Sequence, residues 1–270
     1  MNEMFFKMNK YTWGGGVEIK RKYVISCWNK LNLSVEKYRL EPIWGKRSKI
    51  VETFCKGTGI EIGASCYPVP ILKNNISIKY VDYRDRNEVH DSTWREGLNY
   101  VHVDIVDDAE RLDEIRDRSL DFIIVCHLLE HTKNPIGAIQ IWLKKLKRKG
   151  KLVIAVPDMS TIFDHDRQLT SFEHLLLDNE EPSNTRDYEH YLEYVELSWK
   201  CKDHIEQEVK KLIEEDIRIH YHCWDFDTFF DFLIKLNAYN KKSFELISYN
   251  YNLLIEGKSG KEMIAVLEKR

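Results

Sequence analysis

The middle of the chain alternates short apolar runs with longer amphipathic stretches, and this alternation constrains the fold more than any other feature. The runs predict strands at 59–63, 76–83, 100–105, 120–128 and 151–156. Between the last two, residues 134–148 form a helical pattern, with Pro135 near its start and basic residues in its last turn. Near-continuous apolar strands such as Phe122–Val125 belong in a parallel sheet that is covered on both faces. The sequence therefore predicts a doubly wound α/β fold.

The C-terminal part has a different pattern. Residues 244–251 and 261–268 are two strand-like runs, and a turn region bounded by Gly257 and Gly260 separates them. Two such runs joined by a short connection predict an antiparallel hairpin. The expected sheet is therefore mixed, with a parallel part followed by an antiparallel pair.

Composition limits the class of protein. The chain has 270 residues, 43% of them hydrophobic, which is enough to bury a sizeable core. A net charge of -3 argues against a dedicated nucleic-acid binder. The apolar runs are strand-sized, and the first ten residues contain no long apolar stretch, so we expect no membrane span, no secretory signal and a cytoplasmic location. The six cysteines form no CxxC pair, which argues against a thiolate zinc site.

The charge is distributed unevenly. Residues 1–50 contain 11 Lys and Arg against 4 Asp and Glu, whereas residues 178–217 contain 5 against 13. We interpret the first stretch as a helical N-terminal extension and the second as part of a helical insertion at 159–220. The predicted core is then 51–158 plus 221–270. The insertion is expected either to cover a substrate or to form a dimer surface, so monomer and homodimer both stay open.

Acidic residues follow three of the predicted strands, where ligands bind in open α/β sheets. Glu61 lies in the first strand and precedes a turn at Gly63. Asp82 follows 21 residues later, near the spacing at which a carboxylate binds a ribose diol. Tyr83 can lie against an adenine face, and Asp104 can accept a hydrogen bond from the exocyclic amine. Asp107 and Asp108 are alternatives to Asp104.

These residues belong to motifs that resemble those of class I S-adenosylmethionine-dependent methyltransferases. The similar segments are EIGAS (61–65), VDYRD (81–85), HVDI (102–105), DFIIVCHLLEHTKNP (121–135) and WLKKLKRKGKLVIAVPD (142–158). The resemblance implies a Rossmann-like seven-stranded mixed sheet with S-adenosylmethionine as cofactor. It implies the following cofactor-binding residues: Glu61, Gly63, Ser65, Asp82, Tyr83, Asp104, Ile105 and His127.

One departure from the family keeps two other functions open. The first motif usually has two or three glycines, but Ser65 and Tyr67 follow Gly63 here. A non-catalytic cofactor-binding partner of an active enzyme is therefore one alternative. The other is a nucleotide-dependent oxidoreductase or epimerase, which would need a glycine-rich loop and a Tyr-x-x-x-Lys pair; no tyrosine of the chain has a lysine four residues later.

The acceptor and the catalytic residues come from the segment after the fifth strand. Residues 158–178 resemble a subgroup found in bacterial surface-glycan gene clusters, which implies a small or glycan-linked acceptor, anionic acceptors included. O-methylation of a hydroxyl needs a base, and the candidates are His174, Asp166 and His165. Asp178 lies four residues after His174, where it can orient the imidazole. His220 and His222 are a second candidate pair.

The turn after the fourth predicted strand is also a candidate for a metal site. Glu130 and His131 are adjacent there, and a carboxylate with an imidazole suits a divalent ion. Two ligands do not define a site, and such residues more often close a turn or cap a helix. The sequence alone therefore predicts no metal.

Overall fold

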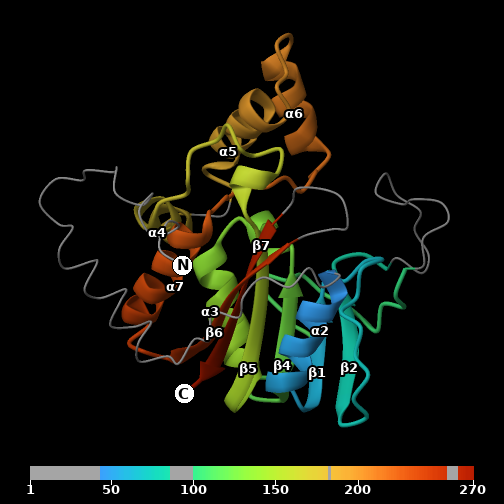
Figure 1. Ribbon diagram of the computed structural model, residues 1–270. Coiled ribbons are helices and arrows are strands. Elements are labelled where there is room, and N and C mark those ends of the chain that lie inside the picture. The colour runs from blue at the N-terminus through green and yellow to red at the C-terminus, as the bar shows by residue number, and fades with distance from the viewer. Residues whose placement is uncertain (1–42, 86–99, 182–183, 254–260) are drawn as a thin grey trace, which may run out of the picture. The chain divides into compact units, whose positions relative to one another are not determined.

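The computed structural model describes residues 43–85, 100–181, 184–253 and 261–270 (Figure 1). Most of the predicted N-terminal extension, residues 1–42, lies outside the described residues. Helix α2 (Ile43–Phe54) is helical across the predicted boundary at residue 50. None of the helices in the described ranges is long and apolar enough to cross a membrane.

The sheet has seven strands in the order β3-β2-β1-β4-β5-β7-β6. The first five in this order run parallel, and β7 runs antiparallel to both of its neighbours. The predicted doubly wound, seven-stranded mixed sheet is therefore confirmed. The strands are β1 (Gly57–Ile62), β2 (Ile76–Asp82), β3 (Ile105–Val106), β4 (Leu120–Cys126), β5 (Leu146–Pro157), β6 (Phe244–Leu253) and β7 (Lys261–Lys269).

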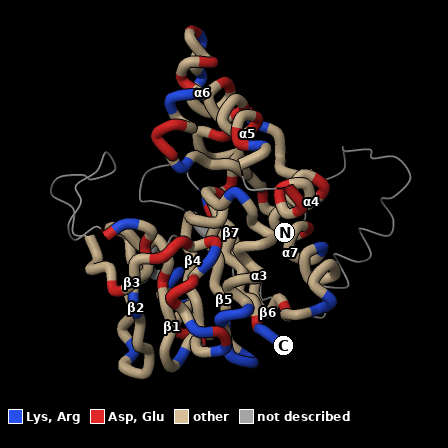
Figure 2. The backbone as a smooth tube through the Cα atoms, turned by 180° about the vertical axis from the view of Figure 1, so that it is seen from behind, with Lys and Arg blue, Asp and Glu red and all other residues tan. Residues whose placement is uncertain are grey.

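Both faces of the sheet are buried, as the apolar strands predict. Phe122 and Ile124 of β4 pack with Val51 of α2 on one face. Ile123 and Val125 alternate with them and point to the other face, where they are also fully buried. Figures 1 and 2 show α2 on one side of the sheet and α3 (Pro135–Lys145) on the other.

The third predicted strand is mostly wrong. Only Ile105 and Val106 pair with β2, and the chain from Tyr100 to Asp104 is irregular. The reason is the Asp104 side chain, whose Oδ2 accepts a hydrogen bond from the Tyr80 N–H at 2.8 Å. A side chain thus takes the place of a backbone carbonyl beside β2. Asp104 consequently stands before the ladder begins and not at the end of the strand.

The helix after β4 forms as its end signals predict. Asn134 is its N-cap, with Oδ1 accepting from the Gly137 N–H at 2.8 Å, and Pro135 occupies the first turn, where no N–H is needed. The helix ends at Lys145, three residues before the predicted end, because β5 begins at once and extends back to Leu146. This length of β5 brings Pro157 and Asp158 to the edge where the parallel strands end.

Residues 159–220 contain mostly helices, which lie beyond the C-terminal ends of the parallel strands in Figure 1. They are α4 (Phe172–Glu180), α5 (Asp187–Glu193), the π-helical turn η3 (Tyr194–Ser198) and α6 (Ile205–Glu214). Figure 2 shows Asp and Glu along α5 and α6. Their own small core contains Tyr191, Val209 and Tyr221. Helix α7 (Phe226–Tyr239) follows, starting from a capping box formed by Asp225 and Thr228.

Candidate active site

The loop after β1 folds back over the end of its own strand. Glu61 is buried, and its carboxylate oxygens accept from the Val69 N–H at 3.1 and 3.2 Å. Burial raises the pKa of Glu61 to about 7, although the Val69 hydrogen bond and the charge of Arg47 lower it. Glu61 therefore fixes the loop after β1.

Ser65 has a backbone conformation that normally selects glycine. Gly63 has φ +68°, and two residues later Ser65 has φ +51°. Both lie in the left-handed region, which costs a non-glycine residue about 1 kcal/mol. The loop thus follows a glycine-type path at Ser65 despite the missing glycine. A Cβ atom at Gly63 would lie 3.1 Å from Cδ1 of Leu128, so close packing also favours glycine at this position.

Asp82 ends β2 with a buried carboxylate at the same edge of the sheet. Its exposed fraction is 6%, and Oδ1 lies 3.5 Å from the Arg84 N–H. Tyr83 is exposed, with the Arg84 guanidinium 4.9 Å from the centre of its ring. An acidic group and an aromatic ring therefore lie next to each other at the end of β2.

The acidic residues that follow β3 are Asp107 and Asp108. Asp107 is buried, and its two carboxylate oxygens accept from the N–H groups of Asp108 and Glu114, each at 2.8 Å. Asp108 is half-buried, and its Oδ1 accepts from the Glu110 N–H at 2.8 Å. Asp104 is exposed and bonded to β2, whereas Ile105 lies within the ladder. The structure therefore places the alternative residues, and not Asp104, at the strand end.

His127 follows β4 and meets a buried ion pair. Its φ is +53°, a strained value for histidine. Nε2 lies 2.9 Å from Oε2 of Glu262, and Nδ1 lies 3.7 Å from Oε1 of Glu130. Arg47 of α2 binds the Glu262 carboxylate through two nitrogens, the shorter contact being 2.5 Å. Burial alone raises the pKa of Glu262, but His127 and Arg47 outweigh it and lower this pKa to about 2.

A second imidazole–carboxylate pair comes from the insertion. Nδ1 of His220 lies 2.5 Å from Oδ2 of Asp164, which is fully buried. Ser198 and Arg167 also bind Asp164, at 2.6 and 3.3 Å. The His220 ring packs edge-on against His131, with ring centres 4.5 Å apart. The chain at 219–222 is held over the end of β4 because the Tyr221 N–H donates to the Glu130 carbonyl.

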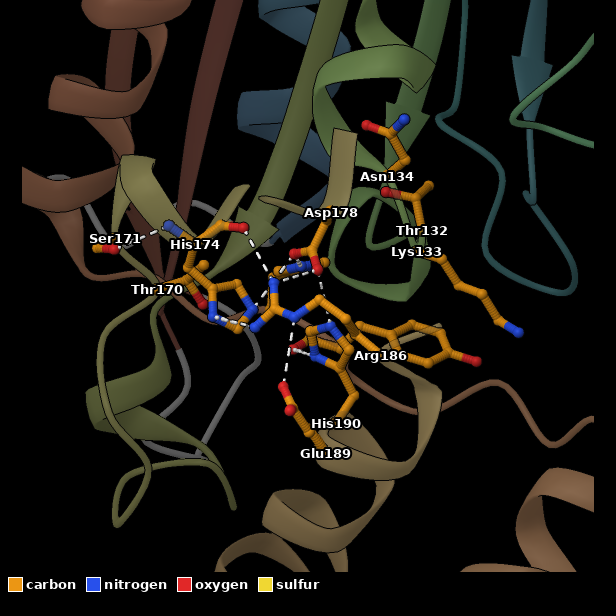
Figure 3. A network of polar contacts seen from close by, with 12 residues as sticks. Thr132, Lys133, Asn134, Thr170, Ser171, His174, Asp178, Arg186, Glu189 and His190 are labelled. Atoms are coloured by element: carbon orange, nitrogen blue, oxygen red, sulfur yellow. Dashed lines mark hydrogen bonds and ion pairs between the residues drawn. The ribbon is translucent and has the colours of Figure 1, made fainter. Parts of the chain in front are cut away.

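His174 belongs to a separate cluster around Asp178 (Figure 3). The predicted contact is present, with His174 Nε2 3.3 Å from Asp178 Oδ2. His190 and His222 also place Nε2 on this carboxylate, at 3.2 and 2.9 Å, and Arg186 binds it at 2.6 Å. Burial raises the pKa of Asp178, but the three imidazoles outweigh it and lower this pKa far below its usual range. Burial lowers the pKa of His174.

His165 and Asp166 lie on the surface, and their side chains contact neither Asp164 nor Asp178 in the hydrogen bonds and ion pairs of the described residues. Their side chains are about half exposed. Asp166 pairs with Lys200 at 2.7 Å, and His165 Nδ1 lies 2.8 Å from the Ile162 carbonyl. The structure thus does not bring the three predicted catalytic residues together.

Sequence reasoning missed Asp164, Glu262 and Arg47 as site residues. Asp164 lies within residues 158–178, the segment that contains the three catalytic candidates, but nothing in the sequence pattern separates it from the exposed Asp166. Glu262 is the second residue of β7, between Lys261 and the apolar run 263–267, and the local pattern does not show that its carboxylate is buried. Arg47 is one of many basic residues near the N-terminus, and only its burial distinguishes it.

Comparison with protein-family models identifies a family for this chain. Residues 49–202, more than half of the chain, match the family model described as "Methyltransferase domain". A search of curated proteins finds no match.

Among solved structures, the chain is similar to the CurJ carbon methyltransferase, with 14% identity and a TM-score of 0.41 over 82% of this chain and 51% of that one. The chain thus spans about half the length of that protein. A SAM-dependent methyltransferase from Methanosarcina mazei is 12% identical, covering 82% and 96% of the two chains with a TM-score of 0.44. The plantazolicin methyltransferase BamL, solved with SAH, is 9% identical, covering 93% and 88% with a TM-score of 0.45. By its family model, the chain belongs to the methyltransferase-domain family and is a class I methyltransferase that depends on S-adenosylmethionine.

Proposed function

We propose that this methyltransferase methylates an oxygen atom of a small or glycan-linked acceptor during the synthesis of a surface polysaccharide. The family supports methyl transfer from S-adenosylmethionine. The oxygen acceptor rests on the chemistry of the side chains at the end of β4, and the glycan context rests on the resemblance of residues 158–178. The proposed acceptor atom is a sugar hydroxyl oxygen or a phosphate or phosphoramidate oxygen.

The residues at the ends of β1 and β2 fit the cofactor. The left-handed turns at Gly63 and Ser65 let the backbone approach a ligand closely, and Glu61 holds the loop in place. The buried Asp82 suits a vicinal diol because a carboxylate accepts two hydrogen bonds. When bound, S-adenosylmethionine supplies a methyl group activated by the adjacent sulfonium. We propose that Tyr83, Ile105 and His127 complete this site.

The adenine amine is a further part of this proposal. Asp104 was expected to accept from it, but its carboxylate is already bonded to β2. Asp108 is the second residue after β3, is half-buried, and uses only one carboxylate oxygen within the described part of the chain. We therefore favour Asp108 for this contact, with Asp104 fixing the start of β3.

The observation that carries the oxygen acceptor is the contact between His127 and Glu262. The carboxylate engages Nε2, so the lone pair of neutral His127 is on Nδ1. Nδ1 makes no hydrogen bond within the described ranges, and its nearest acidic contact is Glu130 at 3.7 Å. The imidazole is about one-third exposed, so an acceptor can reach it. His127 is thus an oriented proton acceptor at the edge where ligands bind.

The two acceptor classes differ in whether they need His127 as a proton acceptor. A hydroxyl loses its proton as the oxygen attacks the methyl carbon, and Nδ1 of His127 can take that proton while Glu262 stabilises the imidazolium. A phosphate oxygen is already anionic and needs no base. We propose that the chain at 220–221, which the Tyr221 N–H holds on the Glu130 carbonyl, covers this edge and limits the access of water.

The test is methyl transfer by the purified chain to hydroxyl-bearing sugar nucleotides and to sugar phosphates, measured as S-adenosylhomocysteine release and as methylated product by mass spectrometry. We expect His127→Ala to lower turnover on a hydroxyl acceptor about 100-fold or more. Cofactor affinity, measured by calorimetry, should fall much less. His204→Ala, which removes an exposed imidazole at the start of α6, is the matched control. Unchanged hydroxyl methylation by His127→Ala would remove His127 from the reaction.

A further inference from the structure

Glu130, His131 and His220 form a compact group beside His127. Each offers one ligand atom, and the three atoms lie within 4.8 Å of one another. Glu130 and His131 belong to the 3-10 turn η1 (Leu129–His131) directly after β4, and His220 comes from the chain that returns from α6. Ligands of one transition-metal ion, each about 2.0–2.2 Å from it, lie closer than about 4.5 Å to one another. The group therefore needs only a small adjustment to surround an ion.

The Glu130 carboxylate lacks the partners that every other buried carboxylate of this region has. It is 1% exposed, and neither oxygen receives a hydrogen bond from another described residue. Its neighbours Glu262 and Asp164 are paired with Arg47 and Arg167 respectively. No Lys or Arg among the described residues forms an ion pair with Glu130, and its one contact of this kind is His127 at 3.7 Å. An uncompensated buried carboxylate is costly, so this position fits a cation.

Both histidines have the outer contacts typical of metal ligands. Nδ1 of His131 lies 2.8 Å from the Ile219 carbonyl oxygen. Nδ1 of His220 lies 2.5 Å from the Asp164 carboxylate. A metal-binding histidine usually donates its second ring nitrogen to a carbonyl or a carboxylate in this way. In both residues Nε2 is therefore the nitrogen that is left to bind a metal.

We infer that Glu130, His131 and His220 bind a divalent transition-metal ion through one carboxylate and two imidazoles. Two imidazoles with one carboxylate favour Zn²⁺, Fe²⁺, Co²⁺ or Mn²⁺ over Mg²⁺, which prefers oxygen ligands. Three protein ligands leave coordination positions for an acceptor oxygen. The ion would lower the pKa of a bound hydroxyl, and the released proton would pass to Nδ1 of His127. The inference that the ion binds does not depend on the proposed function, whereas its role in methyl transfer rests on that function.

The other histidine cluster is a weaker candidate, although it contains more ligands. The Asp178 carboxylate already contacts three imidazoles and the Arg186 guanidinium, so its charge is compensated. Arg186 also places Nη2 3.3 Å from Nδ1 of His174. Because a guanidinium can only donate, it makes that nitrogen an acceptor and leaves the proton on Nε2. His174 is thus in the wrong tautomer to bind a metal through Nε2.

The experiment titrates the untagged, chelator-treated full chain with Zn²⁺ by calorimetry and with Co²⁺ by visible absorption spectroscopy. We expect one ion per chain and a Co²⁺ spectrum of a site with nitrogen ligands. Glu130→Gln and His220→Ala should each weaken binding at least 100-fold, and Asp164→Asn about 10- to 100-fold. His190→Ala, from the Asp178 cluster, should keep the wild-type affinity. Circular dichroism and thermal melting verify that each variant is folded.

Failure of this inference can be separated from failure of the proposed function. The site is wrong if the chain binds no stoichiometric ion, or if His190→Ala loses the ion and His220→Ala keeps it. Loss of methyl transfer after chelation and recovery with Zn²⁺ or Mn²⁺ supports the role of the ion. Full methyl transfer by the chelated chain overturns that role and leaves His127 as proton acceptor.

Discussion

Nε2 of His127 lies 2.9 Å from Oε2 of Glu262, although the two residues are 135 positions apart. The reversed direction of β7 explains the contact. Parallel strands place their C-terminal ends at the ligand edge, and an antiparallel strand places its N-terminal end there. Glu262 is the second residue of β7, so it arrives at the edge where β4 ends. The antiparallel strand pair thus adds a carboxylate to the site.

Glu262→Gln tests this contact in the reaction. The amide keeps the shape of the side chain but removes the charge that stabilises a protonated His127. We expect turnover on a hydroxyl acceptor to fall about 10- to 100-fold, with a smaller change in cofactor affinity. The measurement is the pH–rate profile of both proteins with the same acceptor. A profile and rate equal to those of the wild type would show that Glu262 does not assist His127.

The same carboxylate predicts a loss of stability in acid. The pKa of Glu262 is lowered from 4.5 to about 2 by His127 and Arg47, against the effect of burial. A group with a lowered folded-state pKa stabilises the fold above its unfolded pKa and loses this effect as the pH falls through the folded value. The contribution, about 3 kcal/mol, should therefore disappear between about pH 4.5 and pH 2. Urea unfolding of the wild type and Glu262→Gln should converge over that range; a constant difference would contradict it.

The glycine-type conformation of Ser65 gives a test of stability. Ser65→Gly should raise the free energy of unfolding by about 1 kcal/mol, because φ +51° is strained for serine and relaxed for glycine. Ser65→Val should lower it by more than this amount, since a β-branched residue tolerates the left-handed region least. Chemical unfolding of the three proteins provides the comparison. Equal stability of the glycine and valine variants would show that the loop can adopt another path.

Local sequence signals predicted most of the fold but only part of the site. The apolar strands and the Asn134–Pro135 helix start form as expected, because each depends on adjacent residues. The third strand failed since the Asp104 side chain binds the backbone of β2, and that contact depends on a partner 24 residues away. Asp164 and Glu262 were not predicted as site residues for the same reason. Their partners, His220 and His127, become neighbours only after the sheet and the insertion have formed.

The cofactor site can be tested by affinity. Asp82→Ala removes a buried carboxylate at the end of β2 and should weaken S-adenosylmethionine binding about 10- to 100-fold. Asp108→Ala should weaken it about 10-fold. Asp104→Ala is the matched acidic variant, and we expect a smaller loss from it because this carboxylate is bonded to Tyr80. Calorimetry decides among them: a larger loss from Asp104→Ala than from Asp108→Ala would restore the original prediction for Asp104.

The Asp178 cluster allows a structural role to be separated from a catalytic one. Its carboxylate joins α4 to α5 and to the chain at 222, so Asp178→Asn should lower the free energy of unfolding by about 3 kcal/mol. His174→Ala removes one half-buried imidazole and should cost about 1 kcal/mol. If the proton acceptor is His127, His174→Ala should also keep turnover within about 10-fold of the wild type, far above that of His127→Ala. A loss of more than 100-fold in His174→Ala, with unchanged melting temperature and cofactor affinity, would instead identify His174, one of the three candidates from the sequence, as the base.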